Sequence, residues 1–140
     1  MRYLLDTNVV SEWTRPRPDP AVVAWLETAD EDTLYLSVLA FAEIRLGIEL
    51  LPHGQKRRRI NAWLDDDLAA RFQGRIIDID RAIAEAWAAI VARGRARGAA
   101  PPILDAFMAA TALVHQLMLV TRNERDLAGL DVPILNPWRA

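Results

Sequence analysis

The sequence predicts a three-layer α/β fold in which helices flank a central parallel sheet of five strands. Two observations predict it: short apolar runs of strand length recur along the chain, and most are separated by longer segments whose apolar residues repeat with helical spacing. Strands that alternate with helices pair in parallel through right-handed crossovers. With 140 residues, of which 52% are hydrophobic, we expect a single domain over residues 1–140.

The boundaries of these elements follow from residues that start or stop regular structure. Pro20 suits the first position of a helix, whereas Gly74 and Gly98 suit the residue at which a helix ends. The run Pro52-His53-Gly54 separates two consecutive helices. The expected strands are 2–5, 34–37, 75–78, 117–121 and 132–135, and the expected helices are 21–27, 38–51, 56–72, 81–97 and 103–116.

The composition excludes several classes of function. The chain has no cysteine and only two histidines, which rules out a Cys/His zinc site, a thiol nucleophile and a disulfide scaffold. The glycine-rich nucleotide-binding motifs and the G-x-S-x-G motif of serine hydrolases are also absent. No apolar run is long enough to span a membrane and no signal peptide develops after Met1, so we expect a cytoplasmic protein.

The charge pattern leaves two interpretations open. The formal net charge is −2, so the chain lacks the overall basic character that is typical of nucleic-acid-binding proteins. Its basic residues are nevertheless grouped at 56–59 and at 93–97. Arginines in such groups can hold phosphate by bidentate hydrogen bonds, but the same groups can equally be solvated helix faces.

Three polar residues end strands of the predicted sheet. Asp6 follows the first strand, Ser37 ends the second, and Thr121 ends the fourth. In parallel α/β sheets the functional site lies beyond the carboxyl ends of the strands, at the point where the strand order reverses. We therefore expect the site at this edge, with Asp6 in it.

Two further carboxylates lack a cation partner on their own helices. Glu43 shares a helical face with Leu39, Leu46 and Leu50, and Asp105 lies in the first turn of its helix among apolar residues. Asp105 has the alternative interpretation of a helix-capping or dipole-compensating residue. Because an unpaired buried carboxylate is costly, these two residues and Asp6 predict a shared divalent cation.

The donor atoms define the kind of ion. Oxygen ligands without nearby histidine or cysteine favour Mg²⁺ or Mn²⁺, which normally act on phosphates. With nucleophilic serine, cysteine and nucleotide-cradling chemistry excluded, the remaining interpretation is metal-assisted hydrolysis of a phosphodiester by an activated water. If the three acids converge, repulsion between their like charges should raise the pKa of at least one of them.

Four blocks of the sequence resemble the PIN-domain ribonucleases, and within them the VapC toxins of toxin–antitoxin pairs on the FitB-like branch. The blocks are L-L-D-T-N-V-V-S-E at 4–12, S-V-L-A-F-A-E-I-R-L-G-I at 37–48, L-D-A-F-M-A-A-T-A at 104–112 and V-T-R-N-E-R-D-L at 120–127, followed by N-P-W at 136–138. The resemblance covers essentially the whole chain, in order. It implies a PIN-like fold with a mostly parallel five-stranded sheet.

The resemblance also implies an activity and partners. The activity is Mg²⁺-dependent endonucleolytic cleavage of single-stranded RNA, with Mn²⁺ as an alternative ion. The partners are a small VapB-type antitoxin, a second copy of the chain in a homodimer, and DNA in a higher assembly with the antitoxin. By position, the implied catalytic acids are Asp6, Glu43, Asp105 and Asp126, the first three are the metal ligands, and the supporting polar residues are Thr7, Asn8, Thr121 and Asn123.

Some of these positions have alternative interpretations. Asn123 competes with Asp126 for the fourth role, and Asp126 could instead pair with Arg122 or Arg125. Asn8 could be only a turn or capping residue. Five tryptophans could stack on bases: Trp13, Trp25, Trp63, Trp87 and Trp138. Of these, Trp63 and Trp87 lie on apolar helical stripes that are typical of a core or an interface. Trp25 is the candidate for an antitoxin groove.

Two other functions compete with that of a ribonuclease toxin. One is a catalytically silent adaptor of the same fold that binds RNA or protein, and such a chain would tolerate the loss of an acid. The other is a toxin–antitoxin complex that acts mainly as a DNA-binding autorepressor. The retention of all four acids favours the nuclease.

Overall fold

The computed structural model describes residues 1–139 and forms a five-stranded parallel sheet. The strand order is β3-β2-β1-β4-β5, and all four pairings are parallel. This confirms the predicted α/β class. The strands are β1 Tyr3–Leu5, β2 Leu34–Ser37, β3 Ile76–Ile77, β4 Met118–Val120 and β5 Ile134–Leu135.

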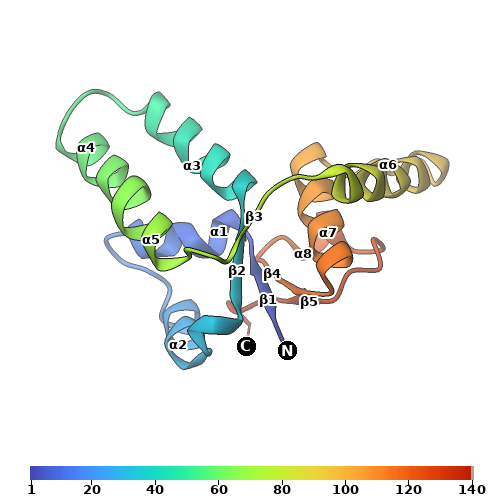
Figure 1. The fold of residues 1–140 in the computed structure, drawn as a ribbon, viewed down its shortest axis with the longest axis horizontal. Coiled ribbons are helices and arrows are strands. Elements are labelled where there is room, and N and C mark those ends of the chain that lie inside the picture. Colours follow the sequence, from blue (N-terminus) through green and yellow to red (C-terminus); the bar gives the residue numbers. More distant parts are fainter. Residues whose placement is uncertain (140) are drawn as a thin grey trace.

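Helices cover both faces of the sheet because successive strand residues point to opposite sides. Leu4 packs with α6 and α7 in one hydrophobic cluster, while the next residue, Leu5, packs with α1, α2 and α3 in another. Leu119 and Val120 of β4 divide between the same two clusters. Figure 1 shows the resulting layers, with α3, α4 and α5 on one side of the strands and α6 and α7 on the other. The α-helices are α1 Thr7–Val10, α2 Pro20–Thr28, α3 Val38–Leu50, α4 Gln55–Ala62, α5 Ala69–Arg71, α6 Arg81–Ala96, α7 Ile103–His115 and α8 Glu124–Leu127.

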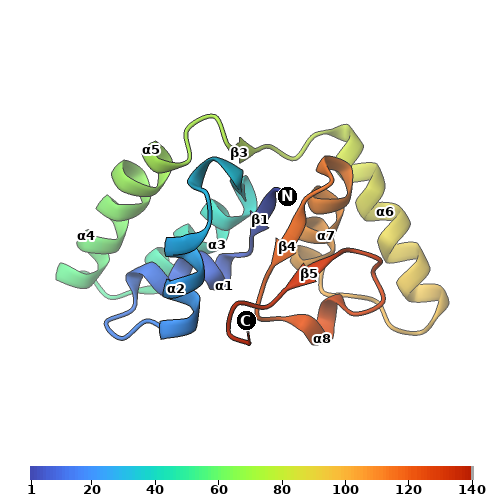
Figure 2. The same cartoon turned by 90° about the horizontal axis from the view of Figure 1, so that it is seen from below.

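The predicted helix over 56–72 is continuous but not uniform. Its middle turn, Trp63–Leu68, is π-helical and joins α4 to α5, as the single rod in Figure 2 shows. The rod ends before Gly74, which has a φ of +82° and so occupies a left-handed conformation that favours glycine. Asp6 indicated the start of a helix, and α1 begins there. Other short elements were not predicted, because the 3₁₀ turns Ser11–Thr14 and Glu31–Thr33 and helix α8 lack enough residues to show a period.

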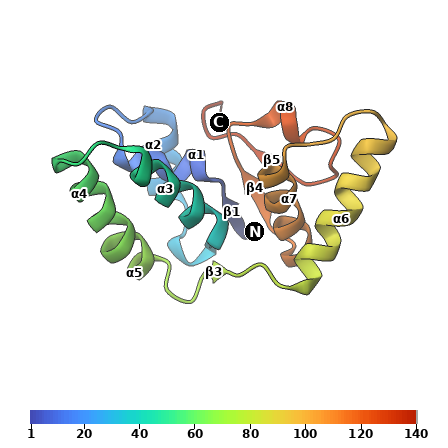
Figure 3. The same ribbon diagram turned by 90° about the horizontal axis from the view of Figure 1, so that it is seen from above.

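The strand order reverses at β1, which lies between β2 and β4. The chain proceeds from β1 to β2 on one side and later returns to β4 on the other, so the carboxyl ends of β1 and β4 adjoin. Figure 3 shows α3 and α7 on either side of β1. These two helices carry Glu43 and Asp105, so the topology brings the predicted acids to one edge of the sheet. Within residues 1–139, no helix is long and apolar enough to cross a membrane.

Candidate active site

Asp6 is held rigidly at the end of β1. It is 6% exposed, and its side chain accepts hydrogen bonds from the Thr7 backbone N–H at 2.7 Å and from Thr121 Oγ1 at 2.7 Å. The first bond caps α1, and the second links β1 to the end of β4. Asp6 therefore combines a local capping role with a fixed position at the reversal point of the sheet.

Glu43 faces Asp6 through the side chain of Thr7. Thr7 Oγ1 donates to Glu43 Oε1 at 2.8 Å, so α1 and α3 are linked at the site. The surroundings of Glu43 differ from the sequence interpretation: Leu46 and Leu50 on its helical face are 60% and 76% exposed, because α3 uses Ala40, Ile44 and Ile48 to pack on the sheet. Glu43 is thus half-buried beside the site, and the apolar residues that follow it on its helical face are exposed.

Asn123 joins the two remaining acids. Its Nδ2 donates to Asp105 Oδ2 at 2.9 Å and to Asp126 Oδ2 at 3.1 Å. Asp105 makes no side-chain capping bond to α7, whose N-cap position is Pro102, so Asp105 is not a capping residue, although it lies in the first turn as the dipole interpretation requires. Asn123 and Asp126 therefore lie together beside Asp105. The structure favours neither of them over the other for the fourth role.

Within residues 1–139, Asp126 forms no salt bridge with Arg122 or Arg125. Arg122 instead places its guanidinium over the Trp138 ring, at 5.2 Å from the centroid. The N-P-W block anchors the same region, because Asn136 Nδ2 donates to Glu124 of α8 at 3.0 Å. The terminal block therefore fixes the loop that carries Asn123 and Asp126.

Asn8 connects α1 to this loop. Its Nδ2 donates to Thr121 Oγ1 at 3.4 Å, and its Oδ1 accepts from the Arg122 backbone N–H at 3.4 Å. Thr121 Oγ1 also accepts from the Asn123 backbone N–H at 3.0 Å. Thr121 and Asn8 thus position the acids without being acids themselves.

The carboxylates perturb one another. Burial raises the pKa of Asp6, against the opposing hydrogen bonds from Thr121 and Thr7. Burial also raises the pKa of Glu43, and the charge of Asp6 adds to that shift. The pKa of Asp105 rises to about 6, first through burial and then through the charges of Asp6, Asp126 and Glu43. No ion pair formed by residues 1–139 includes any of these four carboxylates.

This donor set fits a hard divalent cation. In the described part of the chain no three acidic, histidine or cysteine side chains are spaced to hold one ion between them. Mg²⁺ retains several waters and is usually held by only one or two carboxylates, so a preformed three-acid cage is not required. Four mutually repelling carboxylates with no cationic partner match its chemistry.

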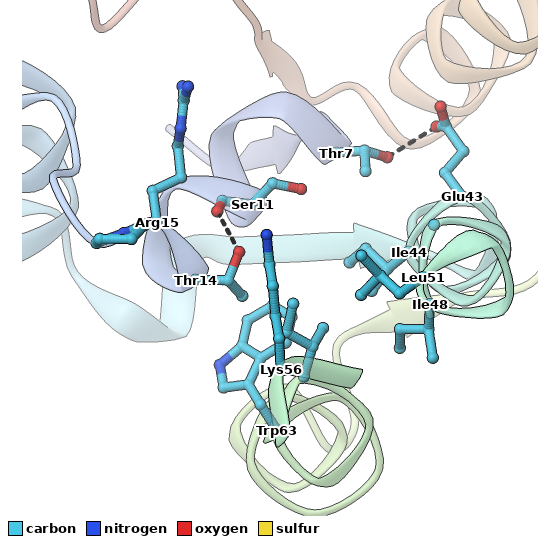
Figure 4. Close-up of a pocket in the computed structure, with 13 residues that line it drawn as sticks. Thr7, Ser11, Thr14, Arg15, Glu43, Ile44, Ile48, Leu51, Lys56 and Trp63 are labelled. Carbon is cyan, nitrogen blue, oxygen red and sulfur yellow. Dashed lines mark hydrogen bonds between the residues drawn. The ribbon is translucent and has the colours of Figure 1, made fainter. Parts of the chain in front are cut away.

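A cavity of about 480 Å³ opens beside Glu43. It runs from Thr7 and Glu43 to Lys56 and Trp63 (Figure 4). The sequence analysis included Trp63 among the tryptophans that could stack on bases, but its helical spacing favoured a core or interface position. Trp63 and Trp87 are both partly buried against the core, and Trp87 stacks on Phe107 at a centroid distance of 5.0 Å.

Trp25 lies away from the acids, whereas Arg97 of the second basic group lines a pocket together with Asp126. Trp25 packs edge-on against Tyr3 at the opposite end of β1 from Asp6, with ring centroids 5.2 Å apart. The antitoxin groove predicted at Trp25 would therefore be remote from the carboxylates. In the second basic group, Arg97 donates to the Gly129 carbonyl oxygen at 3.1 Å and Arg93 lies 3.9 Å from Asp131.

Thr121 supplies a direct test of how the site is positioned. Thr121→Val should lower the free energy of unfolding at pH 7 by about 1–3 kcal/mol, because it leaves the buried Asp6 carboxylate without its side-chain donor. Thr111→Val is the matched control: Thr111 is equally buried, but its hydroxyl donates only to the Phe107 carbonyl oxygen one turn earlier. Urea unfolding of both variants measures the difference, and equal losses would contradict a special role for Thr121.

Comparison with known proteins agrees with this geometry. The PIN domain model matches residues 3–132. The toxin FitB of Neisseria gonorrhoeae is 38% identical over 135 residues, covering 96% of this chain and 97% of FitB. The VapC ribonuclease Y4jK of Sinorhizobium fredii is 33% identical over 135 residues, covering 96% of each chain. The structure of FitAB bound to an IR36 DNA fragment contains a chain that superposes with a TM-score of 0.91 at 37% identity, covering 97% of this chain and 95% of that one.

The match to the family model and the near-complete coverage of these relatives establish the family of this chain. It belongs to the PIN-domain family, in the group of the FitB and VapC toxins. The predicted resemblance is confirmed.

Proposed function

We propose that this protein is a Mg²⁺-dependent endoribonuclease that cleaves single-stranded RNA and acts as the toxin of a toxin–antitoxin pair. The observation that carries the proposal is the gathering of Asp6, Glu43, Asp105 and Asp126 from four separate segments at the reversal point of the sheet, with none of them in an ion pair among residues 1–139. The ribonuclease name of a relative at 33% identity supports the same chemistry.

The proposed roles follow from how each side chain is held. Asp6, fixed by Thr7 and Thr121, provides the rigid ligand position, while Glu43 and Asp105 approach from α3 and α7. Asn123 keeps Asp105 and Asp126 oriented in the same direction. When bound, Mg²⁺ would polarise the phosphate and lower the pKa of an attacking water. The protein's own contribution is to align the phosphodiester for in-line attack and to hold the carboxylates in place around the ion.

The partners belong to the same proposal. An uninhibited nuclease harms its host, so we propose a small antitoxin that contacts the acid edge with an apolar helix and a cation near the carboxylates. We also propose a homodimer. DNA binding by the toxin–antitoxin complex is a second function, which the FitAB structure on DNA favours.

Metal removal tests the proposed activity. The purified chain should cut a long single-stranded RNA transcript in Mg²⁺, lose this activity in EDTA, and recover it when Mg²⁺ is added in excess. The duplex of the same sequence should be cut much more slowly. Gel analysis of end-labelled RNA reads out the products. Cleavage that persists in EDTA would contradict metal dependence, and no cleavage of any RNA in Mg²⁺ would favour the silent adaptor.

A further inference from the structure

The cavity beside Glu43, here called the Trp63 cavity, is continuous with the acid site. Thr7 and Glu43, which share a hydrogen bond, form one end of it. From there it extends between the α1–Ser11–Thr14 segment and the surface made by α3 and the α4 rod (Figure 4). Its volume of about 480 Å³ lies within the range of small-ligand sites. Whatever fills the cavity therefore lies directly next to the carboxylates.

The two walls of the Trp63 cavity differ in chemistry. One wall is apolar and is made by Ile44, Ile48 and Ile60 together with the half-buried Trp63 ring. The other carries the hydroxyl groups of Ser11 and Thr14, of which Thr14 Oγ1 already donates to the Ser11 carbonyl oxygen at 2.8 Å and is left as an acceptor. An aromatic ring with an apolar surround suits the face of a nucleobase, whereas hydroxyl groups suit a sugar or phosphate. The cavity thus offers separate surfaces to the two parts of a nucleotide.

Two positively charged side chains line the Trp63 cavity. Lys56 lines the cavity with its side chain extending past Trp63 towards Ser11 and Thr14 (Figure 4), and it takes part in no ion pair within residues 1–139. Arg15 also lines the cavity, but the buried Glu12 already pairs with it at 3.0 Å. Lys56 is therefore the cation that is free to meet a phosphate.

Trp63 is fixed relative to the acid site. It begins the π-helical turn Trp63–Leu68, and such turns are frequent at functional sites because they reorient side chains within a helix. On the two sides of Trp63 in the sequence, Asn61 and Asp65 both contact Arg45 of α3. The helix that carries Trp63 is thus tied to the helix that carries Glu43, two residues before Arg45.

We propose that the Trp63 cavity binds one nucleotide of the single-stranded RNA next to the scissile phosphate, with its base stacked on Trp63 and a backbone phosphate beside Lys56. This inference rests on the proposed nuclease function and names the part of the chain that holds the substrate. Stacking tolerates all four bases, and only an unpaired base can enter, so the cavity also explains selection of single-stranded over duplex RNA. An unpaired lysine and hydroxyl groups favour RNA over an apolar peptide at this position.

The test measures binding separately from cleavage. In an Asp6→Asn background, a short fluorescein-labelled single-stranded RNA that the parent chain cleaves is titrated and its anisotropy recorded. Trp63→Leu should weaken binding by about tenfold to a hundredfold, whereas Trp63→Phe should stay within about threefold because it keeps an aromatic face. Lys56→Ala should weaken binding and lower the slope of log affinity against log salt by about 0.7.

Matched variants separate these effects from general damage. Trp25→Leu replaces another half-buried tryptophan at the far end of β1, and Arg81→Ala removes an exposed cation on α6 that pairs only with Glu85. Both should leave RNA affinity and its salt slope unchanged. Circular dichroism confirms folding, and RNA should quench a component of tryptophan fluorescence that is missing in Trp63→Phe even though that variant still binds.

Two outcomes overturn the proposal. One is equal RNA affinity for Trp63→Leu and Trp25→Leu, with the same fluorescence quenching in Trp63→Phe as in its parent. The other is that Trp63→Leu and Lys56→Ala keep their RNA affinity but no longer bind a co-expressed antitoxin. That result would make the cavity a protein-binding surface. Failure of the nuclease function is distinguishable, because the parent chain would then cleave no RNA at all.

Discussion

Asp6→Asn is expected to lower the rate of Mg²⁺-dependent RNA cleavage by at least about a hundredfold and to relieve growth arrest when the chain is expressed without an antitoxin. The amide is almost the same shape as the carboxylate, and its single oxygen can still accept from the Thr7 backbone N–H, while its NH2 group takes the position of the oxygen that accepted from Thr121. It cannot supply the negative charge that a hard cation requires. The loss should therefore be much larger in activity than in stability.

Asp19→Asn is the matched control for this change. Asp19 caps α2 by accepting from the Ala21 and Val22 backbone N–H groups, just as Asp6 caps α1, but it lies outside the acid cluster. Initial rates of RNA cleavage and the melting temperatures of both variants give the comparison. Full activity in Asp6→Asn would refute the assignment of Asp6, and equal losses in both variants would reduce its role to helix capping.

The sequence predicted the strand framework because the signals for it are local. Apolar runs such as 3–5 are bounded by polar residues, and a parallel arrangement follows from the helices between the strands. Asp6 could be placed at the edge of the sheet for the same reason, since it directly follows β1. The convergence of Glu43 and Asp105 on Asp6 could be expected from unpaired charge and from family resemblance, but their geometry depends on the packing of α3 and α7.

Features that depend on tertiary contacts could not be predicted. Trp63 has the spacing of a core residue, and only the π-helical turn and the contacts of Arg45 show that its ring lines a cavity. Lys56 lies in a run of basic residues whose members look alike in sequence, yet it is the one in that run that lines the cavity. The role of Asn123 as a bridge between two acids likewise requires the fold of the 121–126 loop.

Asp105→Asn is expected to stabilise the metal-free protein. The pKa of Asp105 is raised from 3.8 to about 6 in the folded state, so the folded state binds more protons than the unfolded state between these values. The free energy of unfolding of the metal-free wild type should therefore fall as pH rises from about 4 to about 6 and then level off. At pH 7 the penalty is on the order of 1–2 kcal/mol, after allowance for the partial exposure of Asp105 to solvent. The amide removes this penalty and can still accept from Asn123.

The same substitution should reduce the effect of the metal. Mg²⁺ at about one hundred times its dissociation constant contributes roughly 2.7 kcal/mol to the wild type, which is a shift of several degrees in Tm. Asp105→Asn removes one ligand and one repelling charge together. The variant should therefore be more stable than the wild type without metal, and Mg²⁺ should stabilise it much less than it stabilises the wild type. Activity should be lost as well.

The central claim is that these acids form one shared cation site at the reversal point of the sheet. Thermal melting of wild type and Asp105→Asn at pH 7, each in EDTA and in excess Mg²⁺, tests it most directly. The account predicts a higher Tm for Asp105→Asn in EDTA and a Mg²⁺-induced rise that is largely confined to the wild type. A lower Tm in EDTA together with the full Mg²⁺-induced rise in Asp105→Asn would contradict it.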